Sequence, residues 1–458
     1  MLVRSLLESI EGFRTGLWGD TRQRAPWLWP YAALILGIAV IAFFFRRKRS
    51  NLRVYNPKQW WEFTNMRSRR DFDTHGPDWI QAWFSKNNEP IRFVVDSGYC
   101  SILPSSMADE FRKMKELCMY KFLATDFHSH LHGFDGFKEV TRDAHLATKV
   151  VLGQFQTQAN KYVVPLSIKA KAAISDVMGD DKGKNLRDQV DKTRSLVEPI
   201  VQKRRAERAA CLTKGVKPPV YVDSIQWFEE AANGDWYDAA GAQLAMHFAG
   251  IYATSDLLIG SLVDICRHPD IIEPLRQEIR TCIAEGGWTP ASLFKMKLLD
   301  SCMKETQRIK PVECATMRSY ALRDVTFSNG TFIPKGELVA VAADRMNNPN
   351  VWEEPEKYDP YRFMRMRQDP EKAAGALLEN TSADHVGFGW NPRACPGRFF
   401  AAKEVKILLA HLLIQYDFKP VPGDNLELFR HSFSVRIHPN TRLMVRRRNE
   451  ELPLPVSQ

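Results

Sequence analysis

The ten residues Phe388–Gly397, FGWNPRACPG, run directly into a predicted helix over Arg398–Gln415, and they decide the fold. Cys395 stands just before this helix begins. Unpaired backbone N–H groups and the helix dipole favour negative charge at such a position. A thiolate held there is a good ligand for iron, so the sequence predicts that Cys395 binds a metal.

Other residues of the same loop favour the binding of a flat ligand that carries a carboxylate. Gly389 and Gly397 allow close approach of the backbone, because neither has a side chain. Arg393 can offer two parallel N–H groups to a carboxylate. A lone cysteine before a helix is usually structural, so the prediction depends on the whole ten-residue arrangement.

This arrangement resembles the haem-ligand loop of the cytochrome P450 family, F-x-x-G-x-R-x-C-x-G. The chain matches it at Phe388, Arg393, Cys395 and Gly397 and departs at Asn391, where the family has glycine. Asparagine is the non-glycine residue best able to adopt a left-handed backbone. The resemblance implies that Cys395 ligates the iron of haem b, iron protoporphyrin IX. It also implies that Arg393 binds a haem propionate and that Phe388 packs beside the ligand.

A second match is the E-x-x-R pair of the family, Glu305 and Arg308 in KETQR. Three residues apart, the two side chains share one helix face. The family pairs them with an arginine of a P-x-R-F type segment, and Arg362 in DPYRF supplies it. The resemblance implies that these three residues form a structural lock on the haem pocket.

A long helix is predicted over Asp235–Arg267, because apolar residues surround it nearly completely, as is typical of a buried central helix. The family's dioxygen motif falls on AGIYATS. Ala249 and Gly250 match it and leave room for dioxygen. Tyr252 stands where the family has an acid, and Ala253 stands where it has the proton-relay threonine. The catalytic candidates are therefore the hydroxyl groups of the next two residues, Thr254 and Ser255.

Two interpretations of these hydroxyls stay open. The Thr254 hydroxyl either takes part in oxygen activation or bonds back to a helix carbonyl. Ser255 or Asp256 is a candidate to hold an ordered water. The substrate-pocket candidates, whose alternative is ordinary core, are Phe248, Ala315, Thr316 and Met317.

The segment 27–45, WLWPYAALILGIAVIAFFF, carries no charge and is just long enough to span a bilayer. Four basic residues follow it at 46–49 and predict a cytosolic location for the rest of the chain. We expect a lumenal segment 1–26, a transmembrane anchor 27–45, a basic linker 46–60 and a catalytic domain 61–458. A cleaved signal peptide is the alternative. The expected location is the endoplasmic reticulum membrane, with a single pass.

The remaining pattern predicts a mainly α fold with small β-sheets, as in a cytochrome P450. The predicted helices cover 107–117 (with Ser105 or Ser106 as its cap), 157–177, 186–209, 271–284 and 298–309. The predicted strands cover 91–104, a hairpin in 324–343 and a second hairpin in 431–448.

The chain is shorter than is typical of the family. Residues 175–190 look like two remote parts of the family pattern joined directly, and the tryptophan-arginine helix that contacts a propionate is missing between Leu123 and Val197. This shortening motivates the hypothesis of a degenerate membrane protein that retains no haem.

Composition excludes some other classes. The net charge of +10 comes without a zinc-finger spacing or other nucleic-acid motif, so no nucleic-acid partner is expected. The eight cysteines contain no C-x-x-C pair and suit a reducing compartment. HSHLH at 128–132 would place three imidazoles on one side of a strand; a solvated or substrate-lid loop is favoured over a metal site. The resemblance implies that an acidic reductase docks beside the ligand helix, and a plain solvated face is the equal alternative; the basic residues there are Arg365, Arg367, Arg398, Lys403 and Lys406.

The resemblance therefore implies a membrane-anchored monooxygenase of fungal secondary metabolism. It would oxidise a lipophilic metabolite, a terpenoid or similar, with electrons from NADPH-cytochrome P450 reductase. The alternative enzyme is a haem-thiolate isomerase, dehydratase or peroxygenase that needs no reductase, which the alanine at 253 motivates.

Overall fold

A computed structural model describes residues 29–44, 49–131, 134–141, 146–155, 159–177, 186–390, 392–424 and 427–453. The chain divides into two compact units, Met1–Ser50 and Asn51–Gln458. The described part of the first unit contains helix α2 (Trp29–Phe44). Its 16 residues extend about 24 Å at the usual rise per residue.

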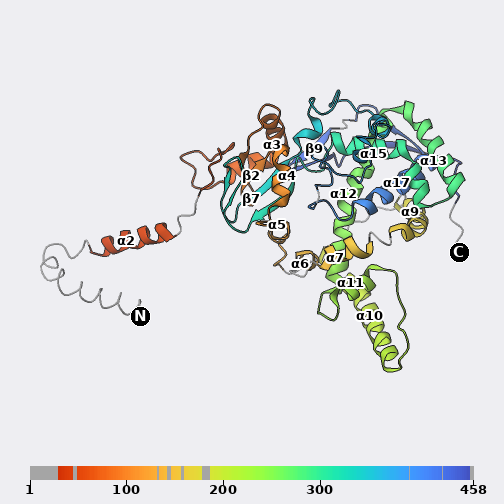
Figure 1. Ribbon diagram of the computed structural model, residues 1–458, viewed down its shortest axis with the longest axis horizontal. Coiled ribbons are helices and arrows are strands. Elements are labelled where there is room, and N and C mark those ends of the chain that lie inside the picture. Colours follow the sequence, from red (N-terminus) through yellow and green to blue (C-terminus); the bar gives the residue numbers. More distant parts are fainter. Residues whose placement is uncertain are drawn as a thin grey trace. The chain divides into compact units, whose positions relative to one another are not determined.

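The second unit contains a five-stranded sheet in the order β1-β2-β7-β4-β3 (Figure 1). Its strands are β1 (Ile91–Val95), β2 (Gly98–Leu103), β7 (Leu338–Ala342), β4 (Ala315–Ala321) and β3 (Leu117–Cys118). Strand β7 is buried along its whole length, pairing parallel with β2 and antiparallel with β4. Helix α3 (Met66–Phe84) packs on β1 through the apolar face that carries Phe72, Ile80 and Phe84.

A helical body occupies the rest of this unit, with α12 (Ala239–Arg267) running through its middle in Figure 1. Asp238 begins α12 by accepting a hydrogen bond from the Gly241 N–H at 2.9 Å. Helices α13 (Ile272–Gly286), α15 (Lys297–Ile309), α17 (Arg398–Gln415) and α9 (Val163–Val177) share its main hydrophobic core. The fold class predicted from the sequence is confirmed.

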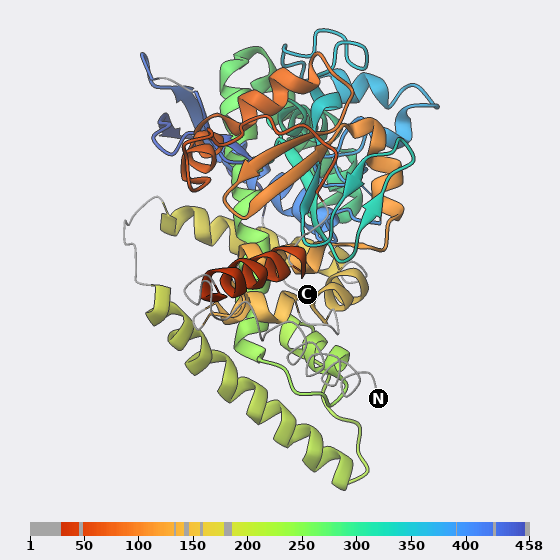
Figure 2. The same ribbon diagram turned by 90° about the vertical axis from the view of Figure 1, so that its left-hand side faces the viewer.

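Helix α10 (Leu186–Thr213) projects from this body beside α11 (Ser224–Ala232) (Figures 1 and 2). Asp223 connects the two helices, because it caps α11 and also binds Arg204 of α10 through two N–H groups, at 2.7 and 2.8 Å. The remaining helices of the described residues are α4 (Ala108–Lys113), α5 (Met119–Asp126), α6 (Asp135–Thr141), α7 (Leu146–Val150), α14 (Pro290–Lys295) and α16 (Arg362–Met366). Short 3-10 and π segments complete them: η1 (Ser105–Met107), η2 (Val151–Phe155), η3 (Ala159–Tyr162), η4 (Pro269–Ile271), η5 (Asp344–Asn347) and η6 (Ala373–Gly375).

The helix predicted over 107–117 is shorter than expected. The segment opens with η1 and continues as α4, which ends at Lys113. Neither predicted serine caps a helix through its side chain, because Ser105 lies inside η1 and its own N–H is bound by Asp344 at 3.0 Å. Proline at 104 sets the start of the segment instead.

The final predicted hairpin is wrong. Strand β10 (Ser434–Ile437) pairs with β9 (Leu428–His431), whereas β11 (Leu443–Arg447) pairs with β8 (Tyr416–Pro420). Adjacent strands in the sequence thus belong to different two-stranded sheets, which alternation of apolar residues alone does not reveal. The hairpin in 324–343 is confirmed: β5 (Val325–Thr326) pairs with β6 (Phe332–Ile333), and β7 follows.

The segment HSHLH forms turns in its described part, in agreement with the favoured loop interpretation rather than a strand. Residues 127–130 form turns, His128 has a positive φ of 49°, and His132 lies outside the described residues. Within the described residues no group of three potential metal-binding side chains is present.

Candidate active site

The loop before α17 is folded tightly on itself. Gly389 adopts a φ of +71°, and a Cβ there would lie 2.8 Å from the Arg393 carbonyl oxygen. The Cys395 N–H donates to the Phe388 carbonyl at 2.7 Å, which closes the loop and sets the cysteine three residues before α17. Asn391 lies outside the described residues.

All eight cysteines lie in described ranges, and Cys395 is the only exposed one. Its surroundings are nevertheless crowded with protein atoms, and this desolvation raises the pKa of the Cys395 thiol above its usual value. Backbone N–H groups of Gly397 and Arg398 oppose the rise. The exposure of Cys395 and the raised pKa of its thiol agree if solvent reaches the sulfur from one side only. Without a metal the thiol therefore stays protonated at neutral pH, and metal binding must release its proton.

Helix α12 contacts α17, and its middle is exposed although both ends are buried. Phe248 is 45% exposed, Ile251 61% and Tyr252 39%. A Cβ added to Gly250 would meet nothing within 4 Å. Apolar exposure in the middle of a central helix marks a face shaped to cover a ligand.

The hydroxyl candidates on α12 differ in their contacts. The Thr254 hydroxyl donates back to the carbonyl of Gly250 within the same helix. Ser255 is exposed. Ala249 and Ala253 are exposed as well, on the same stretch.

Arg393 connects the loop to the sheet. Its Nη2 donates to the carbonyls of Met114 (2.7 Å) and Leu117 (2.9 Å), and its Nη1 donates to the Ser319 hydroxyl (3.0 Å). Its Nε–H is buried and has no partner among the described residues. Arg318, the neighbour of Ser319 on β4, has an unpartnered buried Nε–H too. Two such donors fit the carboxylates of a cofactor, and Arg318 was not found from the sequence because no motif marks it.

Glu305, Arg308 and Arg362 lie together. Arg308 donates to both Glu305 carboxylate oxygens at 2.8 and 2.9 Å, and Arg362 Nε donates to the same group at 3.0 Å. Glu305 and Arg308 are fully buried. The remaining donors of Arg308 bind the carbonyls of Met346 (2.7 Å) and Pro355 (2.8 Å), so the buried charges are fully hydrogen-bonded.

The pocket candidates divide into two groups. Phe248 is exposed on α12, whereas Ala315 and Met317 are buried in separate clusters of the core and Thr316 is half-buried. Met317 has a φ of +56° in the bulge that breaks the register between β4 and β7. Ala315 and Met317 therefore pack among core side chains.

An aromatic wall, defined as Phe127, Phe137, Phe248 and Tyr252, continues from α12. The ring centroids of Phe127 and Phe137 are 4.8 Å apart, and each contacts Phe248 edge-on, at 5.6 and 4.8 Å. The Arg436 guanidinium lies 4.0 Å over the Tyr252 ring. Sequence reasoning missed this wall because its members come from two distant stretches of the chain, residues 127–137 and α12.

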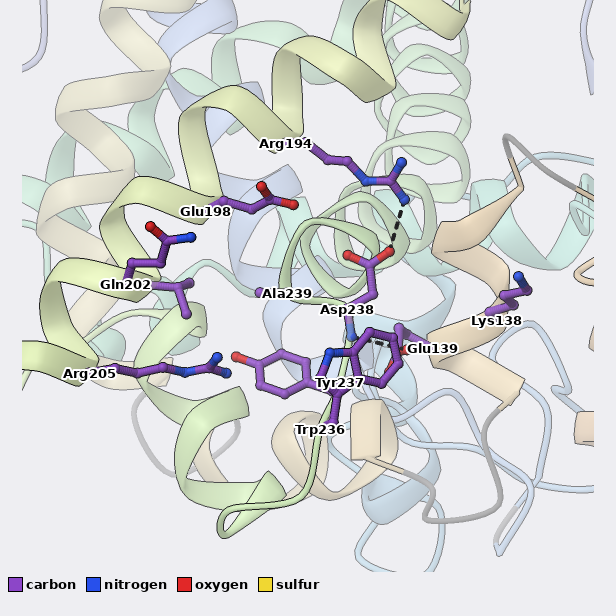
Figure 3. Close-up of a pocket in the computed structure, with 11 residues that line it drawn as sticks. Lys138, Glu139, Arg194, Glu198, Gln202, Arg205, Trp236, Tyr237, Asp238 and Ala239 are labelled. Atoms are coloured by element: carbon purple, nitrogen blue, oxygen red, sulfur yellow. Dashed lines mark hydrogen bonds and ion pairs between the residues drawn. The ribbon is translucent and has the colours of Figure 1, made fainter.

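A cavity of about 540 Å³ lies elsewhere, between α6, α10 and the start of α12 (Figure 3). Arg194 and Asp238 form an ion pair of 3.1 Å across it, and Trp236 and Tyr237 contribute apolar surface. Neither Cys395 nor the exposed middle of α12 lines this cavity, so it is separate from the candidate site.

The basic cluster proposed for reductase docking is partly wrong. Arg367 and Lys406 are largely buried, and both form ion pairs with the buried Asp300. Charges committed to an internal carboxylate cannot face a partner. Arg365 remains at the surface, where it pairs with Asp359, and Arg398 binds the carbonyls of Glu379 and Cys395.

In the described residues one helix, α12, is long and apolar enough to cross a membrane, but 39% of its apolar window is buried inside the second unit. Both ends of α12 are buried in this unit. The predicted anchor 27–45 overlaps α2, and its first two and last residues lie outside the described residues.

The sequence of this chain is similar to those of one family of known proteins. A sequence model of the family described as Cytochrome P450 matches residues 181–445. The Dihydro-ML-236C monooxygenase mlcC of Penicillium citrinum is 61% identical, over 99% of each chain. The Dihydromonacolin L monooxygenase LovA of Aspergillus terreus is 60% identical, over 96% of this chain and 97% of its own.

The alignment with mlcC runs over 523 positions, more than the 458 residues of this chain, so it contains gaps in this chain. Among solved structures, "Retinoic acid bound cyanobacterial CYP120A1" superposes with a TM-score of 0.60 at 20% identity, covering 82% of this chain and 95% of that one. This likeness supports the fold. The family match and the two curated relatives show that the chain belongs to the cytochrome P450 family and is a P450 monooxygenase.

Proposed function

We propose that this monooxygenase hydroxylates, or otherwise oxidises, a lipophilic secondary metabolite of the dihydromonacolin L type. The observation that carries the proposal is the single exposed cysteine, Cys395, at the entrance of α17 and inside the ligand loop of the family. The substrate class rests on the names of the 60%-identical relatives.

The cofactor that fits is haem b. Cys395 Sγ would bind the iron, with Phe388 and Gly397 beside it. The unpartnered Nε–H groups of Arg393 and Arg318 would receive propionates. When bound, the haem supplies dioxygen activation, which the thiolate promotes.

The chain's own residues orient the substrate and control water. The aromatic wall offers an apolar surface over which a hydrocarbon ring system can lie, and Ala249 and Gly250 leave space beside it. Thr254 and Ser255 are the hydroxyl candidates for proton supply. The lock of Glu305, Arg308 and Arg362 holds α15 against the segment before α16, which fixes the floor of the site.

Electrons would come from NADPH-cytochrome P450 reductase, which would dock on the face that carries Arg365 and Arg398. The segment 27–45 would anchor the chain in the endoplasmic reticulum membrane by a single pass, with the residues after the basic linker in the cytosol. The apolar character of this segment and the positive cluster at 46–49 support both points.

The test is turnover by membranes that contain the full chain and the reductase, with dihydromonacolin L, NADPH and ¹⁸O₂. The expected product gains one ¹⁸O atom, only with NADPH and not with Cys395→Ala. Conversion without NADPH or reductase would favour an isomerase or peroxygenase instead. Normal expression without any haem would favour the degenerate protein.

A further inference from the structure

The hairpin of β9 and β10 carries two arginines on opposite faces, and only one of them has an acidic partner among the described residues. Arg430 of β9 lies directly opposite Val435, so it points away from the face that carries Arg436. Arg430 Nη1 forms an ion pair of 3.1 Å with Asp78. Arg436 Nη2 instead donates to a neutral group, the Ser434 hydroxyl, at 3.0 Å.

The surroundings of Arg436 are unfavourable for a cation. Its Nε–H group is buried and has no partner among the described residues, and its Nη1 group forms no hydrogen bond with any of them. Desolvation lowers the pKa of Arg436, and no charge on a described residue offsets this effect. A partly buried charge without a counter-charge is destabilising. A bound carboxylate would supply both the counter-charge and the acceptors.

Arg436 lies at one end of the aromatic wall. Its guanidinium is 4.0 Å over the Tyr252 ring, and that ring stacks on Phe248 at a centroid distance of 6.4 Å. Phe248 in turn contacts Phe137 edge-on, at 4.8 Å. A ligand whose hydrocarbon part covers these rings would therefore meet a cation at its end. The exposed apolar face of α12 and the unpaired guanidinium belong to one surface.

The two propionates of haem are already matched by other donors. Arg393 in the loop before α17 and Arg318 on β4 each offer a buried N–H without a partner among the described residues, whereas Arg436 lies on β10 against α12. We propose that Arg436 binds the carboxylate of a lipophilic acid whose hydrocarbon part lies on the aromatic wall, and that it thereby selects the substrate. The acid's role as substrate rests on the proposed function, whereas its binding does not.

The two parts of this surface contribute differently to recognition. The aromatic wall offers apolar contact to any hydrocarbon, charged at its end or not. The guanidinium separates a carboxylate from a neutral acceptor of the same size, because a hydrogen bond between charged groups is stronger than one to a neutral group. The difference corresponds to about tenfold in affinity.

Calorimetric titration of the full chain in nanodiscs tests the recognition without NADPH or reductase. The two probes are cyclohexanebutyrate and the neutral cyclohexanebutyramide, which differ in charge and hardly in shape, and empty nanodiscs supply the background. We expect the wild type to bind the carboxylate about tenfold more tightly than the amide at neutral pH. Equal affinities, or no binding of the carboxylate, would overturn the proposal.

Variants of the hairpin assign the preference to one side chain. Arg436→Gln is expected to bind both probes with the affinity that the wild type shows for the amide, because the wall remains; Arg436→Met repeats the test if the first variant does not fold. Arg436→Lys keeps a charge and should keep part of the preference. The control Arg430→Gln should match the wild type. A preference that survives in the neutral variants, or that the control loses equally, overturns the proposal.

Two further readouts separate this proposal from its neighbours. Loss of haem from Arg436→Gln with an unchanged preference would assign the guanidinium to a propionate and overturn the proposal. With NADPH and reductase, cyclohexanebutyrate should inhibit turnover of dihydromonacolin L competitively, about tenfold more weakly in Arg436→Gln; inhibition of another type would place the acid outside the substrate site. If the wild type prefers the carboxylate but turns nothing over, the proposed function fails and the recognition by Arg436 stands.

Discussion

The Glu305 carboxylate is the residue on which the buried charge network depends. Glu305→Gln keeps the volume but leaves two guanidinium groups, those of Arg308 and Arg362, without their counter-charge. Loss of one partner of a buried ion pair costs about 3–5 kcal/mol. We expect that decrease in the free energy of unfolding, measured by denaturant titration of the full chain.

A surface pair supplies the control. Glu354 and Lys357 form an ion pair of 3.0 Å with side chains 64% and 67% exposed. Glu354→Gln should cost less than about 1 kcal/mol. Equal losses in the two variants would contradict a structural role for the buried network.

Glu404 on α17 gives the chain a defined pH dependence. Desolvation raises its pKa from 4.5 to about 7. Between these values the folded chain binds more protons than the unfolded chain, so this contribution to stability falls as the pH rises from 4.5 through 7. Glu404→Gln should flatten that fall in the free energy of unfolding. The exposed Glu353→Gln serves as the control, and an identical slope in all three proteins would refute the assignment.

At the scale of elements, α12 leaves open space at Gly250, where the reaction would need room. A methyl group at position 250 meets open space, and alanine is a better helix former than glycine by about 1 kcal/mol. Gly250→Ala should therefore unfold no more easily than the wild type, yet its turnover should fall because the methyl group fills the site. Gly260→Ala is the comparison, since its methyl group would press on Thr306 and destabilise the chain. Full turnover by Gly250→Ala would show that this face is not part of the site.

The elements divide clearly into those that the sequence predicts and those that it does not. Helix α17 has the predicted bounds and α15 is within a residue of them, since long apolar periodicity and a defined start specify a helix locally. The pairing of β8 with β11 joins residues far apart in the sequence, such as Tyr416 and Arg447, which local alternation cannot encode. Strands β9 and β10 form a local hairpin that starts before the alternating stretch 431–448, so the alternation does not locate it.

The same difference holds for the site. Cys395 and Arg393 lie in one loop with a recognisable spacing, and Glu305 and Arg308 lie one helical turn apart. Arg318, Phe127 and Phe137 reach their positions only through tertiary packing. The exposure of the middle of α12 was also unforeseen, because an apolar sequence predicts burial without saying whether protein or a ligand supplies it.

At the scale of the molecule, the division at Ser50 predicts that the second unit keeps its cofactor alone. A chain beginning at Asn51 should bind haem as the full chain does, while carbonate-washed membranes should retain much less of it, because the segment 27–45 is gone. Measurement of haem and protein in both fractions checks this. Equal retention of the two chains by the membrane would contradict the proposed anchor.

The shortening relative to mlcC makes haem retention the central question for the whole molecule. The most direct measurement is the carbon monoxide difference spectrum of the reduced full chain, compared with Cys395→Ser and with Cys211→Ser, whose cysteine is half-buried on α10. We expect the red-shifted Soret band of thiolate-ligated iron in the wild type and in Cys211→Ser, and its loss in Cys395→Ser. A folded wild type without that band, or a Cys395→Ser variant that keeps it, would contradict the assignment of Cys395 as the iron ligand.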